Sequence, residues 1–236
     1  MNNGQAEFRD QRFWGWKERN SGRTHAGLTF INCEFWSCSL GLSPVLGKYD
    51  LSLRPRVANM TFRNCAETGC GLNAAIVEDV VVDGLKTSDL LQTWAVVFKH
   101  VTLKGKIDRL MFSDFLHPGF PRLQELIAPA NSNYYARVDW ALDIKEAELK
   151  ELDCRGVPAR LVRRDPETQI MVTRERVLAS GDDIAVGGEY WHDLLKLFLD
   201  SSYADHVLIA PRRDPQFKEF VAGLHRLRQA GVAEPD

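Results

Sequence analysis

A short motif recurs in the first half of this chain, and it constrains the fold more than any other feature. Residues 29–33 (TFINC) and 61–65 (TFRNC) match at four of five positions, and a second cysteine follows each copy five residues later. A looser pattern of alternating apolar and polar residues closed by glycine extends the repeat. With it, residues 76–91 align without a gap on 97–112, at a spacing of 21 residues.

Repeats of roughly 20 residues are typical of a parallel β-solenoid. One turn of chain cannot bury its own inward side chains, so turns stack and their apolar residues form columns, here expected to include Phe30, Phe62, Val80 and Val101. Asn, Asp and Gly mark corners because they tolerate left-handed backbone angles, and His100 aligns with such a polar corner position. We predict a mainly β fold, a right-handed parallel β-helix, over residues 28–162. The rival interpretation is an ordinary α/β or sandwich protein with a chance repeat.

The segments 30–35 (FINCEF) and 62–65 (FRNC) resemble the five-residue units of the pentapeptide-repeat family, over about residues 28–162. The resemblance implies a right-handed β-helix with Phe or Leu pointing inward. The chain departs from the family in the 15-residue spacing between the copies at 62 and 77, which favours a looser β-helix. Relatives that protect topoisomerases are strongly acidic rods, and a formal charge of −2 argues against that role here.

The segments outside the repeat are expected to close or decorate the solenoid. Residues 1–27 form an N-terminal cap, and 113–133 form an inserted loop with a short helix over 121–127. Residues 163–236 form an α/β capping region. In that region we expect a helix at 190–199, a strand at 206–210 and, after Asp214 as N-cap, a helix to about 229 that covers the open end of the solenoid.

The five cysteines are odd in number, and the N-terminus lacks the features of a secretion signal. Free thiols in a cytoplasmic protein are therefore expected. Four thiolates can also close a tetrahedral zinc site, but Cys-x4-Cys is wider than the usual zinc knuckle. We predict structural columns and no cofactor, and we keep as the alternative a metal site made of Cys33, Cys38, Cys65 and Cys70.

No nucleophile elbow, phosphate-binding loop or dinucleotide fingerprint occurs in the sequence, so no catalytic residue is assigned. A polysaccharide-acting enzyme (lyase or hydrolase) is the alternative function, because right-handed β-helices include such enzymes. Its chemistry requires clustered carboxylates and a basic residue. The acids available in or beside the repeats are Asp79, Asp83, Asp108 and Asp114.

The predicted function is non-catalytic binding of a protein partner, in the manner of a bacterial immunity or inhibitor protein that occludes its target. No apolar run is long enough for a membrane span, and 30 basic against 32 acidic residues give no support for nucleic-acid binding. The motif Arg-Arg-Asp-Pro occurs twice, and its arginines either grip an anionic partner or are solvated at strand ends. The candidate binding residues are Trp14, Trp16, Phe115, His117, Phe120, Arg163, Arg164, Arg212 and Arg213.

Overall fold

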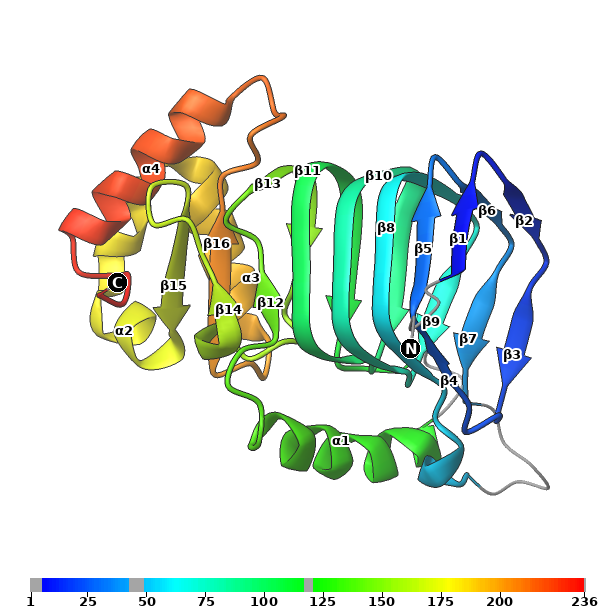
Figure 1. The fold of residues 1–236 in the computed structure, drawn as a ribbon. Helices are drawn as coiled ribbons and strands as arrows, with labels where there is room; N and C mark the ends of the chain where they lie inside the picture. Colours follow the sequence, from blue (N-terminus) through cyan, green and yellow to red (C-terminus); the bar gives the residue numbers. More distant parts are fainter. Residues whose placement is uncertain (1–5, 43–48, 117–120, 236) are drawn as a thin grey trace.

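The computed structural model describes residues 6–42, 49–116 and 121–235 (Figure 1). The predicted mainly β class is confirmed: a large parallel sheet curls around an apolar interior and carries a few helices on its outside. Its strands are β1 (Ala6–Arg9), β2 (Arg12–Trp14), β3 (Lys17–Arg19), β4 (Thr24–Ala26), β5 (Leu28–Ile31), β6 (Glu34–Trp36), β7 (Ser39–Gly41), β8 (Arg56–Thr68), β9 (Gly71–Asn73), β10 (Ile76–Trp94), β11 (Val97–Ser113), β12 (Leu142–Asp143), β13 (Ala147–Asp153) and β14 (Val162–Arg163).

Strand pairing in this sheet follows the repeat of the sequence. β10 pairs in parallel with β8 on one side and with β11 on the other, and Val80 faces Met60 and Val101. Side chains at such paired positions form ladders that run across the strands. The ladder Phe8–Phe30–Phe62 stacks its rings at centroid separations of 5.3 and 5.2 Å. Phe30, Val80 and Val101 are buried and Phe62 is partly buried, which confirms the predicted inward positions.

Backbone corners recur every five residues along the long strands. From residue 59 to residue 84, every fifth residue has a positive φ angle, and all but Ala74 are Asn, Asp or Gly, which adopt such angles at low cost. The prediction that His100 occupies a corner is confirmed by its φ of 55°. A second run with the same five-residue spacing extends from residue 95 to residue 105. The corner residues of the two runs are Asn59, Asn64, Gly69, Ala74, Asp79, Gly84, Ala95, His100 and Gly105.

Residues 1–27, expected to form a cap, themselves contribute strands β1 to β4 to the sheet. β1 pairs with β5 and β2 with β6, so the sheet begins one repeat earlier than the sequence pattern indicates. The physical reason is that Phe8 and Phe13 continue the inward ladders of Phe30 and Phe35.

The insertion after β11 contains a helix, α1 (Pro121–Tyr135), which is longer than the predicted 121–127 and continues through Pro129. Its buried side chains recur every four residues, at Leu123, Ile127, Asn131 and Tyr135, and this stripe offsets the hydrogen bond that Pro129 removes. α1 lies beneath the sheet, along the direction in which the strands stack (Figure 1). It packs over the corners at Ala74 and Ala95, together with a 3-10 turn, η1 (Leu51–Leu53).

The C-terminal region is a small α/β unit built on the antiparallel pair β15 (Gln169–Thr173) and β16 (Asp205–Ile209). The predicted helix and strand at 190–199 and 206–210 are present, with slightly different ends. The helix expected to cap the sheet begins later than predicted and packs inside this unit instead, because its apolar stripe fits Trp191. Val207 and Ile209 of β16 pack into the buried apolar cluster of the large sheet. The remaining elements are η2 (Ala159–Leu161), α2 (Arg174–Ala179), η3 (Gly181–Gly187), α3 (Glu189–Asp200) and α4 (Phe217–Gln229).

Candidate functional site

Two tryptophans stand side by side on the outer face of the first strands. Trp14 of β2 pairs with Trp36 of β6, and their rings stack at 5.5 Å. Trp14 is 75% exposed although it is one of the largest apolar side chains. The alternation of β2 causes this exposure, because Phe13 points into the sheet and its neighbour must point out. We call Trp14 and Trp36 the tryptophan pair.

Charged residues surround the tryptophan pair. Arg12 forms an ion pair with Glu34 at 2.7 Å, and Arg9 forms one with Glu7. Residues 6–26 hold five basic and three acidic side chains, whereas the whole chain is slightly acidic. Trp16, the second aromatic residue predicted here, is partly exposed and lies edge-on against His25 at 5.2 Å. The first strands therefore present an apolar and mildly basic surface.

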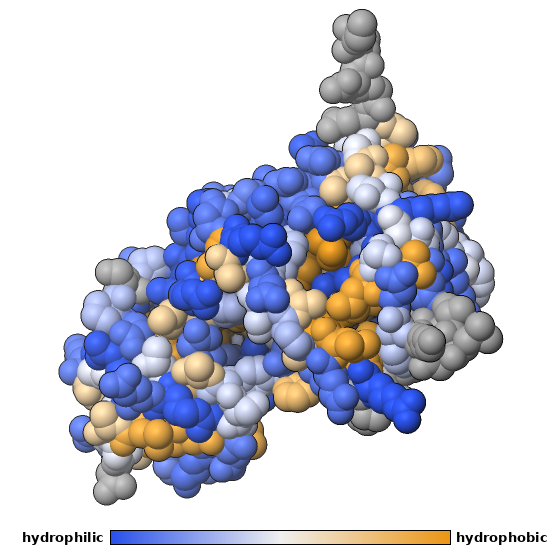
Figure 2. Space-filling model, turned by 90° about the horizontal axis from the view of Figure 1, so that it is seen from below, coloured by the Kyte–Doolittle hydropathy of each residue, from blue (hydrophilic) through white to orange (hydrophobic). Residues whose placement is uncertain are grey.

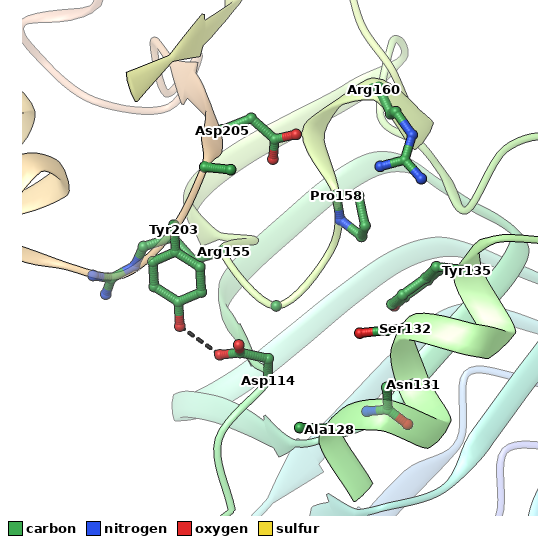
Figure 3. A pocket seen from close by; sticks show the side chains of 12 residues that line it. Asp114, Ala128, Asn131, Ser132, Tyr135, Arg155, Pro158, Arg160, Tyr203 and Asp205 are labelled. Carbon is green, nitrogen blue, oxygen red and sulfur yellow. Dashed lines mark hydrogen bonds between the residues drawn. The ribbon is translucent and has the colours of Figure 1, made fainter. Parts of the chain in front are cut away.

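A polar pocket of about 280 Å³ lies where the sheet, α1 and the C-terminal unit meet (Figure 3). Asp114, just after β11, accepts a hydrogen bond of 2.5 Å from the Tyr203 hydroxyl. Arg155 lies near the Tyr203 ring, with its guanidinium carbon 5.8 Å from the ring centroid. The pocket is also lined by Ala128, Asn131, Ser132, Tyr135, Gly156, Pro158, Arg160, Ala204 and Asp205.

Local sequence holds the pocket walls in place. Gln124 of α1 accepts a hydrogen bond from Leu116 N and donates one to Asp114 O, which fixes the chain after β11. Gly156 donates to Phe112 O at 2.7 Å, and a Cβ added there would lie 2.7 Å from Asp114 N. Glycine at this position allows the chain at residue 156 to approach the backbone of residues 112–114.

The charged groups of the pocket are mostly engaged by neighbours. Burial raises the pKa of Asp114, and the hydrogen bond from Tyr203 opposes that shift. Arg155 donates from Nε to both Asp153 oxygens at 2.9 Å, and this pairing raises its pKa. Asp205 accepts from Ala159 N at 2.9 Å. Two carboxylates beside an arginine meet the composition required for polysaccharide cleavage, although each already makes a structural hydrogen bond.

Of the aromatic residues predicted in the insertion, Phe115 lies beside this pocket. It is exposed and approaches the Tyr203 ring edge-on at 6.3 Å. His117 and Phe120 lie outside the described residues.

The two Arg-Arg-Asp-Pro motifs lie next to each other. Arg212 of the second motif pairs with Asp165 of the first at 2.7 Å, and Arg213 reaches Asp108 beside the sheet at 2.7 Å. Arg163 lies 4.1 Å above the Trp140 ring. Arg164 donates to the carbonyls of Ala159 and Val162. All four guanidinium groups thus have partners within the chain.

The cysteines point inward and make weak hydrogen bonds to backbone carbonyls. The Sγ atoms of Cys33, Cys38, Cys65 and Cys70 donate to Phe8, Phe13, Phe30 and Phe35, respectively. Burial raises the pKa of Cys65 and of Cys70 to about 11. Within residues 6–42, 49–116 and 121–235, no three His, Cys, Asp or Glu side chains are grouped so as to hold a metal ion.

The sequence marks Asp114 as an available acid but carries no local sign of its pocket partners. Tyr203 is 89 residues away in sequence and Arg155 lies between repeats, so no local spacing links them.

In the described part of the chain, no helix is long and apolar enough to cross a membrane. Seen from below, charged and polar residues cover most of the surface, and apolar residues gather near the middle and at the C-terminal end (Figure 2).

Comparison of the chain with protein-family models, with curated proteins and with solved structures found no significant match.

Proposed function

We propose that this protein is a non-catalytic binding scaffold for another protein, of the bacterial immunity or inhibitor type, acting in the cytoplasm. The observation that carries the proposal is Trp14, which is 75% exposed and stacked on Trp36. Tryptophan is enriched among residues that dominate the energy of protein interfaces. A rigid, solvent-facing tryptophan on a stiff sheet loses little conformational freedom when a partner covers it.

The scaffold in this proposal is a right-handed β-helix of the kind that the pentapeptide-repeat resemblance implies. Two observations support it: the left-handed corner at every fifth residue from 59 to 84, and the parallel ladders that link β1, β5, β8, β10 and β11. Such a fold places side chains of successive strands at a regular spacing of about 4.8 Å on the outside. That spacing suits a flat recognition surface.

The chemistry around Trp14 points to a partner with an apolar centre and an acidic rim. Basic side chains outnumber acidic ones in residues 6–26, although the chain as a whole has a charge of −2. Opposite charge at the rim of an interface mainly speeds association and fixes orientation. The tryptophan pair supplies the apolar centre.

The test compares Trp14→Ala with the unchanged protein as bait in a native lysate. Loss of an interface tryptophan costs about 2 kcal/mol or more, so the partner retained by the unchanged protein should bind about 30-fold more weakly to Trp14→Ala. Quantitative mass spectrometry of the bound proteins, followed by titration of the purified partner, measures this difference.

The matched control is Leu178→Ala, which removes another exposed apolar side chain, 61% exposed, on α2 in the C-terminal unit. The partner should bind this variant as tightly as it binds the unchanged protein. A partner that binds Trp14→Ala with unchanged affinity contradicts the proposal, provided that both variants melt at similar temperatures.

A second candidate function, cleavage of a polysaccharide, is favoured by the pocket in which Asp114 and Asp205 stand with Arg155. If Asp114 acts as general acid, Asp114→Asn should lower the release of reducing ends from an acidic polysaccharide by at least 100-fold. Tyr203→Phe keeps the ring and removes only the hydrogen bond to Asp114, so it should have a smaller effect. Absence of cleavage by the unchanged protein across a polysaccharide panel excludes this candidate.

A further inference from the structure

The inner face of the curled sheet lines an apolar cavity of about 220 Å³ that is partly open to solvent. Its walls come from strands β6 to β11, so it extends across several neighbouring strands. Phe62, Val77, Val82, Leu91 and Phe98 are among the side chains that line it. Protein interiors are normally close-packed, so an apolar cavity of this size that the inward side chains leave unfilled is unusual.

The cavity exists because side chains become smaller in the middle of the inward ladders. The ladder Phe8–Phe30–Phe62 continues into Val82, and only then into Leu103. Replacement of a phenyl ring by an isopropyl group at one step leaves the missing volume unfilled, because the backbone spacing is fixed by strand pairing.

Two further inward ladders change in chemistry as well as in size. Phe13 and Phe35 are followed by Glu67, and Leu40 and Leu72 are followed by Thr93. Glu67 stands at the level of Phe62, Thr93 stands one strand further at the level of Val82, and both line the cavity.

The Thr93 hydroxyl is the polar group of the cavity wall that has unused hydrogen-bonding capacity. Its residue is 3% solvent-exposed, and its Oγ1 has no hydrogen-bond partner among the described residues. Leaving a buried hydroxyl unpaired costs free energy. The Glu67 carboxylate is also buried, but it accepts a hydrogen bond from Cys70 N at 3.1 Å.

We propose that this cavity binds a small aliphatic molecule that carries one hydrogen-bonding group, with its chain against the valine and phenylalanine walls and its polar end at Thr93. An apolar guest would displace water from these apolar walls and supply the van der Waals contacts that the cavity lacks. A hydroxyl on the guest would give Thr93 its missing partner. An aliphatic chain matches the apolar side chains that the cavity presents across several strands.

The experiment titrates the full chain with 1-hexanol and follows binding by saturation-transfer NMR and by the melting temperature. The unchanged protein should bind 1-hexanol and melt at a higher temperature as the alcohol is added at millimolar concentration. Val82→Phe continues the aromatic ladder into the void, so it should weaken binding at least tenfold. Thr93→Val keeps the side-chain shape but removes the hydroxyl, so it should weaken binding several-fold.

The control is Leu178→Phe, a substitution of similar size on the exposed surface of α2, which should bind 1-hexanol like the unchanged protein. Val80→Leu, a smaller addition at another wall position, replaces Val82→Phe if circular dichroism shows that the latter does not fold. Failure of the unchanged protein to bind 1-hexanol, or equal binding by the filled variant, overturns the proposal. Equal binding by Thr93→Val overturns the assignment of Thr93 as the polar contact. None of these outcomes depends on Trp14, so they are separable from the proposed protein partner.

Discussion

At the scale of single residues, the buried polar side chains are the sites where folding and ionisation are coupled. His206 of β16 is buried, its ring stacks on Phe198 at 5.9 Å, and its Nδ1 atom has no hydrogen-bond partner within the described ranges. Burial lowers the pKa of His206 to about 4, because the charged imidazolium loses its hydration. The native state therefore requires the neutral ring.

This depressed pKa predicts a loss of stability in mild acid. Since the unfolded chain binds a proton near pH 6.5 and the native state only near pH 4, the neutral histidine stabilises the fold above pH 6.5. That contribution is lost as the pH falls towards 4 and amounts to on the order of 3 kcal/mol. Urea unfolding of the unchanged protein and of His206→Asn between pH 4 and 8 measures the difference. Burial raises the pKa of Glu67 and Asp114, but their contributions cancel in the comparison. A constant difference across this range contradicts the prediction.

At the scale of elements, close approaches decide where the helices pack. Gly223 in the middle of α4 lies against the carbonyl of Gly187 and the ring of Trp191, and a Cβ added there would stand 2.4 Å from both. Trp191 also donates from Nε1 to Phe220 O at 3.1 Å. The glycine thus explains why α4 packs against η3 and α3 and does not cover the sheet.

Gly223→Ala is therefore expected to destabilise the protein, although alanine is the better helix former. Helix propensity alone would favour alanine by about 1 kcal/mol, whereas the overlap with backbone and indole atoms should give a net loss of about 1–3 kcal/mol. The control is Ala222→Gly at the exposed neighbouring position, where only propensity acts and about 1 kcal/mol is lost. Thermal and urea unfolding measure both changes, and a gain in stability for Gly223→Ala would show that the contact is not tight.

At the scale of the whole molecule, the sheet and the C-terminal unit are joined by several different contacts. Val207 and Ile209 of β16 belong to the same buried cluster as the sheet. Arg213 pairs with Asp108, and Tyr203 donates to Asp114, at two separate points of the junction. The pocket between the two parts therefore has walls that are fixed on both sides.

The parts of this architecture that sequence could predict are those encoded within one repeat. The inward positions of Phe30, Val80 and Val101 follow from local alternation, and the corner at His100 follows from its alignment with Asn and Asp. The sheet starts earlier than predicted because Phe8 and Phe13 match the ladders without sharing the TFxNC motif. The extension of α1 past Pro129 depends on what its stripe covers. The pocket could not be predicted, because Tyr203 meets Asp114 only after the C-terminal unit has folded against the sheet.

The inward direction of the cysteines has a practical consequence for labelling chemistry. Cys33, Cys38, Cys65 and Cys154 are buried and Cys70 is only partly exposed, and burial raises the pKa of Cys154 to about 12. Thiol-reactive dyes attack the thiolate at an accessible sulfur, and burial restricts access to four of these five thiols. A single cysteine introduced on the outer wall would then carry a fluorophore or spin label selectively, with the five native thiols left in place.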